Sequence, residues 1–307
     1  MSAHEESGVA ARHAPVLLRE TIRELAPRSG GIYVDATLGR GGHAEAILEA
    51  SAPDGRLIGI DRDPRALEET APRLARFGSR ARLVHAAFAE VPRVLEAEGA
   101  PRVHGLLADL GVSSPQLDDP ERGFSFRAEG PLDMRMDPTR GETAAELIAR
   151  TDERDLADIL YRLGEERRSR PIARSIKRAE GEGRMRTTAE LRSAVVAVLG
   201  PRRVGGVDPA TRTFQALRLA VNGELDQLDA LLAAIPELLQ DRGIAAIISF
   251  HSLEDRAVKR AFRGDDRLEP TTKKPIVASE DEERANPRSR SAKLRAARRV
   301  TRGEARA

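Results

Sequence analysis

Residues 31–48 combine a short apolar run, a glycine-rich turn and a second apolar stretch with helical spacing. Ile32, Tyr33 and Val34 are strand formers, three glycines follow within 39–42, and residues 44–48 favour a helix. Glycines between the end of a strand and the start of a helix let the main chain approach a ligand, while free N–H groups of the first helical turn face it. The pattern indicates a nucleotide-type pocket; a turn that merely packs is the alternative.

Further apolar runs predict the rest of a sheet. Helical patterns separate them, and they cover 56–60, 81–85, 103–108 and 244–250. The second predicted strand is followed by Asp61, placed twenty residues after Gly41, where doubly wound folds put an acid on a ribose hydroxyl. We therefore expect an α/β protein with a doubly wound, Rossmann-like sheet.

The spacing of apolar residues changes between the fourth and fifth predicted strands. Residues 119–141 are punctuated by Gly and Pro, and residues 143–201 show helical periodicity with few β-branched runs. We expect an inserted α-helical substrate-recognition subdomain at 119–210, within a sheet domain formed by 1–118 and 211–307. In that domain the pattern predicts one long helix over 211–239 and a closing antiparallel pair of strands near the end of the chain.

The charge is uneven along the chain. The formal net charge is only +2, yet residues 284–307 hold nine Lys or Arg against one acid. This basic terminus is typical of a protein with a phosphate-rich partner, and equally of a solubilising tail. A second basic group falls on a predicted helical face, where a solvated surface is the usual explanation and an RNA contact the alternative. Its members are Arg167, Arg168, Arg170, Arg174, Lys177 and Arg178.

Composition excludes several classes of chemistry. The chain has no cysteine, so disulfides, thiolate metal sites and cysteine nucleophiles are excluded. The glycines are not followed by the G-K-[ST] of a P-loop, and neither a G-x-S-x-G elbow nor an H-E-x-x-H pattern occurs. No apolar run approaches the length of a bilayer span, so we expect a soluble cytoplasmic protein without a membrane partner or a bound metal.

Three residues near the ends of predicted strands are candidates for function. Asp109 follows the fourth strand and is the leading catalytic candidate, because chemistry in doubly wound sheets lies beyond the carboxyl ends of the strands. A capping or turn role is the alternative for this acid. Phe88 follows the third strand and could stack on a purine, although a core position is favoured. His251 follows the fifth strand at the same edge.

This arrangement is the one expected of an S-adenosylmethionine methyltransferase, because a glycine turn, a ribose acid and an aromatic flank lie beside an acid-led loop. Two other classes stay open. A nucleotide enzyme on the same fold would not bind the methyl donor, and a non-catalytic RNA-binding factor would bind it without turnover. Calorimetry with S-adenosylmethionine distinguishes a methyltransferase from the nucleotide enzyme. Transfer of labelled methyl groups to small ribosomal subunits distinguishes it from the RNA-binding factor.

Longer blocks of sequence resemble the bacterial ribosomal RNA small subunit methyltransferase H family, also called MraW. The resemblance runs in order from about residue 13 to 300. The blocks are HAPVLLRE, DATLGRGGHAEAIL, GIDRDP, ADLGVSSPQLDDPERGFSFRAEGPLDMRMD, TRTFQALRLAVNGEL, ISFHSLEDRAVKRAF, KKPIV and NPRSRSAKLRAARR.

The resemblance implies methylation of the exocyclic N4 amine of a decoding-centre (P-site) cytosine in 16S rRNA. S-adenosylmethionine would be the donor, leaving as S-adenosylhomocysteine, and the small ribosomal subunit the partner; the oligomeric state, a homodimer included, stays open. The implied catalytic residues are Asp109 and, less strongly, Asn222 and His251. The implied cofactor contacts are Gly41, Gly42, His43, Asp61, Phe88, Asp109 and Gln116.

The missing cysteines add an independent constraint. Methylation at the C5 carbon of a pyrimidine needs a cysteine nucleophile, whereas an exocyclic amine can attack the methyl sulfonium directly. The absence of cysteine therefore agrees with methylation of an amine.

Overall fold

The computed structural model describes residues 15–202 and 207–301. The chain divides into two compact units. The first unit contains residues 1–61, 65–110 and 231–307, and the second contains 62–64 and 111–230. Apart from residues 62–64, the second unit therefore lies, along the chain, between the fourth and fifth strands of the first unit's sheet.

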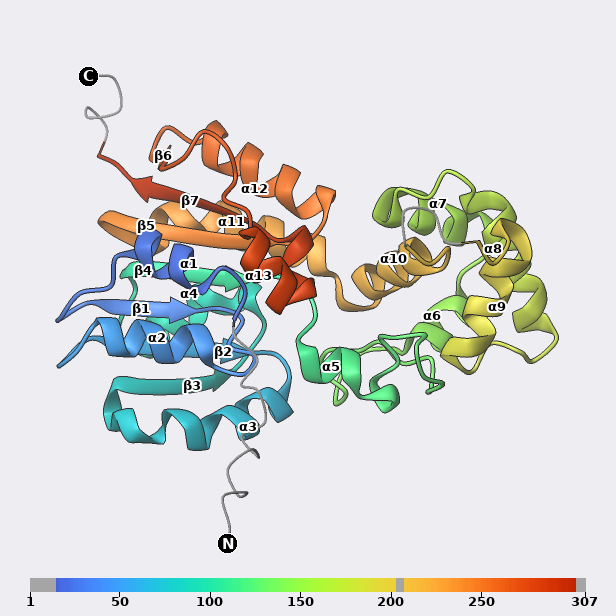
Figure 1. Ribbon diagram of the computed structural model, residues 1–307, viewed down its shortest axis with the longest axis horizontal. Helices are drawn as coiled ribbons and strands as arrows, with labels where there is room; N and C mark the ends of the chain where they lie inside the picture. Colours follow the sequence, from blue (N-terminus) through green and yellow to red (C-terminus); the bar gives the residue numbers. More distant parts are fainter. Residues whose placement is uncertain (1–14, 203–206, 302–307) are drawn as a thin grey trace, which may run out of the picture. The chain divides into compact units, whose positions relative to one another are not determined.

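The first unit contains a seven-stranded sheet in the order β3-β2-β1-β4-β5-β7-β6 (Figure 1). The five strands from β3 to β5 are parallel, and the chain order reverses between β1 and β4. This confirms the predicted doubly wound, Rossmann-like sheet. The strands are β1 (Ile32–Asp35), β2 (Arg56–Asp61), β3 (Ala81–His85), β4 (Val103–Asp109), β5 (Leu239–Ser249), β6 (Leu268–Pro270) and β7 (Lys293–Arg299).

The central strands are those with uninterrupted apolar runs. In β4, residues 105–108 are all buried, as expected for a strand covered on both faces. The edge formed by β7 differs, because β7 runs antiparallel to both β5 and β6. An antiparallel closing pair is therefore present, but its second strand is β6, and the KKPIVAS stretch contributes only a bridge between Ile276 and Leu294.

Helices cover both faces of the sheet. Figure 1 shows α1 and α2 in front of the strands and α4 and α11 behind them. The core in front of the sheet includes Leu17, Ile47 and Leu107, which are fully buried. The helices of this part are α1 (Leu18–Leu25), α2 (Gly42–Ala50), α3 (Pro64–Leu74), α4 (Val91–Ala97), the portion of α11 (Glu224–Leu238) from residue 231 onward, α12 (Ser252–Gly264) and α13 (Glu280–Ala285), with 3-10 turns η1 (Ala75–Arg80), η2 (Phe88–Glu90) and η4 (Pro287–Ser291).

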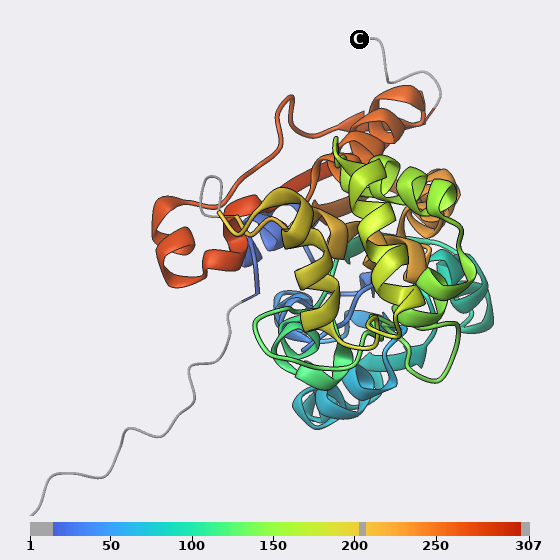
Figure 2. The same cartoon turned by 90° about the vertical axis from the view of Figure 1, so that its right-hand side faces the viewer.

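The second unit is helical and has its own apolar core. Its helices pack side by side in green to yellow in Figure 2, with α7 against α8 and α10 and with α8 against α9. Capping boxes start helices of this unit at Thr143 with Glu146 and at Thr187 with Glu190. The elements are α5 (Ser114–Asp118), η3 (Pro120–Arg122), α6 (Ala144–Arg150), α7 (Glu153–Gly164), α8 (Ser169–Gly181), α9 (Thr188–Leu199) and α10 (Thr211–Asn222).

The prediction of one long helix over 211–239 is wrong. Gly223 lies between α10 and α11 with φ of 59°, a left-handed conformation that ends α10. Residues 211–230 belong to the second unit and residues from 231 onward to the first. Within the described ranges, 15–202 and 207–301, no helix is long and apolar enough to span a membrane.

Candidate active site at the carboxyl ends of the strands

The glycine turn after β1 is tied to the acid that ends β2. The Gly39 N–H donates to Oδ2 of Asp61 at 2.8 Å, and the hydroxyl of Thr70 donates to the Gly39 carbonyl at 2.8 Å. Gly41 has φ of 71°, and a Cβ there would lie 2.4 Å from a carbon of Thr70. A Cβ on Gly42 would lie 2.3 Å from Pro15. The turn therefore needs glycine for close packing as well as for conformation.

Asp109 is the last residue of β4, and its carboxyl group lies among other acids. Its N–H donates to the hydroxyl oxygen of Thr37 at 2.6 Å. About a quarter of its side chain is exposed, yet its Oδ1 atom is buried and has no hydrogen bond in the protein. Burial, with the nearby carboxylates of Asp35 and Glu254, raises the pKa of Asp109 well above its usual value. The protonated form of this carboxyl group is therefore favoured more strongly than in an exposed aspartate.

His43 contacts Asp109 from the first turn of α2. Its Nδ1 lies 3.8 Å from Oδ2 of Asp109, and its Nε2 lies 3.0 Å from the Val16 carbonyl oxygen. A carbonyl oxygen only accepts hydrogen bonds, so in the neutral ring Nε2 carries the proton. Burial lowers the pKa of His43 to about 4. The ring is consequently neutral at physiological pH and presents a lone pair, not a proton, to Asp109.

Asp35 is a member of this cluster that the sequence analysis missed. It ends β1, is almost completely buried, and accepts a hydrogen bond from the Thr37 N–H at 3.1 Å. Burial is the main cause that raises the pKa of Asp35 to about 7, and the charge of Asp61 adds to it. The available signal was its position, because Asp61 and Asp109 also end parallel strands.

The structure places His251 as the N-cap of α12. The Glu254 carboxylate accepts from the N–H groups of Phe250 and His251 at 2.8 and 3.3 Å, and His251 Nδ1 accepts from the Glu254 N–H at 3.4 Å. Its Nε2 lies 3.1 Å from Glu254 Oε1 without hydrogen-bond alignment. This capping box gives His251 a structural role in starting the helix.

Phe88 lies in η2, just after β3, and is buried. The preference for a core position over an exposed stacking surface agrees with this burial. Phe88 also belongs to the first unit, with Gly41, Gly42, His43, Asp61 and Asp109.

Gln116 and Asn222 belong to the second unit. Gln116 donates from its amide to Asp63 at 2.9 Å, and Arg122 donates to the same Asp63 oxygen at 2.7 Å. All three side chains are buried. Sequence reasoning missed the Asp63–Arg122 pair, because fifty-nine residues separate its members.

Asn222 uses its amide to join α10 to the segment 134–136. Its Nδ2 group donates to the carbonyl oxygens of Met134 and Arg218 at 2.7 and 2.9 Å. Its Oδ1 atom accepts from the Met136 N–H at 2.8 Å. Both amide protons are therefore engaged with the main chain, and this geometry favours a positioning role over direct catalysis.

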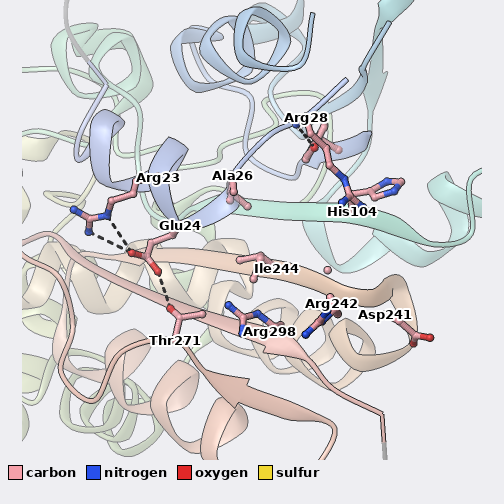
Figure 3. Close-up of a pocket in the computed structure, with 13 residues that line it drawn as sticks. Arg23, Glu24, Ala26, Arg28, His104, Asp241, Arg242, Ile244, Thr271 and Arg298 are labelled. Atoms are coloured by element: carbon pink, nitrogen blue, oxygen red, sulfur yellow. Dashed lines mark hydrogen bonds and ion pairs between the residues drawn. The ribbon is translucent and has the colours of Figure 1, made fainter. Parts of the chain in front are cut away.

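A cavity with a volume of about 330 Å³ lies away from these residues. It is beside the first halves of β1, β4 and β5, whereas Asp61 and Asp109 stand at the carboxyl ends. Figure 3 shows Arg28 and His104 on one side of it and Arg242 and Arg298 on the other. Among residues 15–202 and 207–301, no group of three or more His, Asp or Glu side chains could hold a metal ion.

The residues at the carboxyl edge fit an adenosyl-type methyl donor. The turn and the start of α2 offer main-chain N–H groups, Asp61 stands where a ribose is bound in such folds, and Asp109 has a buried oxygen that lacks a partner. We expect Gly41, Gly42, Asp61 and Asp109 to hold the donor, with His43 supporting Asp109.

The mixed sheet, with its five parallel strands, and this edge define a Rossmann-like protein of the methyltransferase class. The model of the MraW methylase family matches residues 10–300, so the chain belongs to this family. This membership confirms the predicted family and a donor of the S-adenosylmethionine type.

Relatives of similar length share much of the sequence. The chain is 63% identical over 294 residues to ribosomal RNA small subunit methyltransferase H of Sorangium cellulosum, covering 96% of this chain and 93% of the relative. It is 52% identical to the protein of that name from Synechococcus elongatus, covering 94% and 95%. An rRNA methylase structure from Streptococcus thermophilus aligns with 12% identity and a TM-score of 0.42, covering 93% of this chain and 96% of that one.

Proposed function

We propose that this protein transfers a methyl group from S-adenosylmethionine to the exocyclic N4 amine of a P-site cytosine in 16S rRNA of the small ribosomal subunit. Sequence identities of 63% and 52%, over nearly the full length, to proteins named ribosomal RNA small subunit methyltransferase H support the rRNA substrate. The choice of N4 is what the resemblance to this family implies, and the chemistry of the site supports it.

The observation that carries the proposal is the environment of Asp109. The N4 lone pair of cytosine is delocalised into the ring, so the amine is a weak nucleophile until an acceptor binds its hydrogens. A carboxyl group whose pKa is raised is a stronger base once ionised than an ordinary aspartate. The carboxyl group of Asp109, at the end of β4, is the acceptor that we assign to the amine.

The chain's residues contribute position and a proton acceptor. When bound, S-adenosylmethionine supplies the electrophilic methyl group. Thr37 holds the main chain of Asp109 through the 2.6 Å hydrogen bond, so the carboxyl group is fixed at the end of β4. His43 presents a lone pair to Oδ2 and can accept a hydrogen bond from the protonated carboxyl group. We assign much of the rate to positioning and the remainder to Asp109 as the acceptor of the amine proton.

Composition supports an amine acceptor in the substrate. Attack on a pyrimidine ring carbon through a covalent enzyme intermediate requires a thiolate, and the chain has no cysteine. An exocyclic amine needs no covalent intermediate.

We further propose that the helical region around 119–210 recognises the substrate and that the small ribosomal subunit in the cytoplasm is the partner. Reaching a stacked base requires the target nucleotide to leave its stack. The buried network of Asp63, Gln116 and Arg122 gives this region a defined structure on which such recognition can be built.

The test is transfer of tritiated methyl groups to small subunits that lack the modification, followed by mapping of the labelled nucleotide. The expected product is N4-methylcytidine at a single P-site position. Label at a carbon atom, at another base or in protein would overturn the proposal. Omitting the subunit controls for self-methylation.

A further inference from the structure

Helix α12 presents an exposed surface made of cations. Its buried positions include Val258 and Phe262, one turn apart, which face the protein interior. The opposite side carries exposed basic residues, and the segment after β6 adds two more. We call these five the α12 basic face: Lys259, Arg260, Arg263, Lys273 and Lys274.

The two parts of the α12 basic face are joined. The guanidinium of Arg263 donates to the Lys273 carbonyl oxygen at 3.0 Å. The helix also packs against β6, which directly precedes this segment. The five side chains therefore belong to one surface of the first unit.

The acids of α12 do not neutralise this face. Glu254 is buried in the capping box with His251, and Asp255 pairs with Arg295 at 2.7 Å and Lys293 at 3.4 Å on β7. At the end of the helix, Asp265 pairs with Arg267, which leaves Asp266 as an exposed acid in the next turn. None of the five cations forms an ion pair within the part of the chain that the structure describes.

Other basic surfaces of the protein differ. On α8, Arg174 pairs with Glu153 at 3.2 Å and Lys177 with Glu180 at 3.1 Å. On β7, Lys293 and Arg295 pair with Asp255. The two regions that the sequence singled out as basic are thus partly neutralised, whereas the α12 basic face is not.

The position of α12 links this face to the candidate site. Asp109 is paired in register with Ile248 of β5, and α12 begins four residues later at Ser252. The charge of Glu254, in its first turn, is one of those that raise the pKa of Asp109. At about 1.5 Å per residue, Lys259 and Arg263 stand roughly 8 and 14 Å along the helix axis from Glu254.

We propose that the α12 basic face binds the RNA phosphates that flank the target nucleotide. The inference rests on the proposed function, and it identifies which surface holds the rRNA strand. Cations that form no ion pair in the protein break no such pair when they bind phosphate, and each phosphate contact releases counterions from the RNA. Contacts of this kind supply affinity and position without reading sequence.

The test replaces Lys259 and Arg260 by Gln together and measures methyl transfer to unmodified small subunits. We expect a higher KM for the subunit, with unchanged affinity for S-adenosylmethionine and an unchanged thermal midpoint. Loss of two phosphate contacts reduces the slope of log affinity against log salt by about 1.4 to 1.8. The ratio of the wild-type affinity to the variant's affinity should therefore fall by about 10-fold when the salt concentration rises fourfold.

A matched control removes two cations elsewhere on the first unit. Arg28 and Arg242 line the cavity beside the amino-terminal halves of the strands and are exposed (Figure 3). The Arg28→Gln, Arg242→Gln variant should keep the wild-type KM and salt slope. An equal loss in this control would show that net charge, not the α12 basic face, determines binding, and would overturn the proposal.

Direct binding separates the two proposals. If the wild-type protein methylates the subunit but the Lys259→Gln, Arg260→Gln variant has the same KM and salt slope, the α12 basic face is not the RNA surface. If the wild-type protein transfers no methyl group, the proposed function fails, and the affinity of both proteins for a 16S RNA fragment without ribosomal proteins still tests the face. A loss seen with intact subunits but not with that fragment would indicate a protein contact and overturn the assignment to RNA.

Discussion

The Nδ1 atom of His43 lies 3.8 Å from the Oδ2 atom of Asp109, and the proton of the imidazole is on the far side of the ring. Two groups that both accept hydrogen bonds face each other unless the carboxyl group carries a proton. The raised pKa of Asp109 and the lowered pKa of His43 describe this arrangement. The edge of the sheet thus favours the protonated form of this acid, and a cationic ligand beside it would favour the ionised form.

Replacing Asp109 by Asn should abolish most methyl transfer while the protein stays folded. Loss of a positioned proton acceptor typically costs about 10²- to 10⁴-fold in rate. Single-turnover transfer measures the rate, and circular dichroism measures folding. The exposed acid Asp266, replaced by Asn, is the control and should leave the rate unchanged. Turnover near the wild-type level in the Asp109→Asn protein would remove this residue from the mechanism.

Binding of S-adenosylmethionine should release protons from the candidate site. The pKa of free Asp109 is raised, and a cationic ligand beside it favours the ionised form, so binding lowers that pKa. Affinity should accordingly increase with pH until the raised pKa is passed, and then level off. Calorimetry in buffers of different ionisation enthalpy measures the proton count. The Asp109→Asn protein should lose this release; retention of the full release would assign it to another group.

Asp35 should make the protein less stable as pH rises from about 4 to about 7. Its unfolded pKa is near 3.8 and its folded pKa is about 7, so over this range the folded state binds the extra proton. The free energy of unfolding then falls as pH increases. Asp35→Asn should be more stable than wild type above pH 7 by a few kcal/mol, since one pKa unit corresponds to roughly 1.4 kcal/mol.

Urea denaturation across this pH range compares the two proteins. The advantage of Asp35→Asn should disappear as the pH falls below 3.8, where both folded and unfolded Asp35 are largely protonated. A difference that does not depend on pH would contradict the raised pKa.

Asn222→Ala should reduce stability as well as activity. The substitution leaves the Met136 N–H and the Met134 carbonyl without their partner, at about 1–3 kcal/mol for each buried group. Urea denaturation at constant pH measures this cost. If Asn222 acted only in catalysis, the variant would lose turnover with no change in its denaturation midpoint.

His251→Asn distinguishes a helix cap from a catalytic imidazole. Asn is a good N-cap residue and can accept from the N–H of Glu254, so α12 should still form. We expect kcat within a few fold of wild type for His251→Asn, and a loss of roughly 1 kcal/mol in stability for His251→Ala. A pH-dependent loss of kcat in the Asn variant, with normal stability, would identify the imidazole as catalytic.

Local patterns were sufficient for much of the fold. The third strand was predicted at 81–85 and is Ala81–His85, and the glycine turn joins a strand to a helix as its composition indicated. The wrong predictions concern features that the local spacing of apolar residues does not determine. A continuous apolar stripe over 211–239 concealed the break at Gly223. The position of β7 in the sheet depends on its pairing with β5, which is distant in sequence.

The candidate site divides in the same way. Asp61 and Asp109 were recognisable because each ends an apolar strand, whereas the structural uses of Asn222 and His251 depend on main-chain groups that periodicity does not place. Asp35 had the same positional signal as the other two acids and was overlooked. Its influence becomes visible only when neighbouring parallel strands bring three carboxyl groups to one edge.

The sequence by itself determined the class of sheet, the family and the carboxyl edge where chemistry is expected, because strand periodicity and contiguous motifs are local properties. Only the tertiary structure decided which charges are neutralised and which are available. Pairing of β7 with β5 brings Lys293 and Arg295 to Asp255, while Lys259, Arg260 and Arg263 on the outer side of α12 form no ion pair among the described residues. Such neutralisation depends on the distance between side chains from separate elements, which the order of residues does not specify.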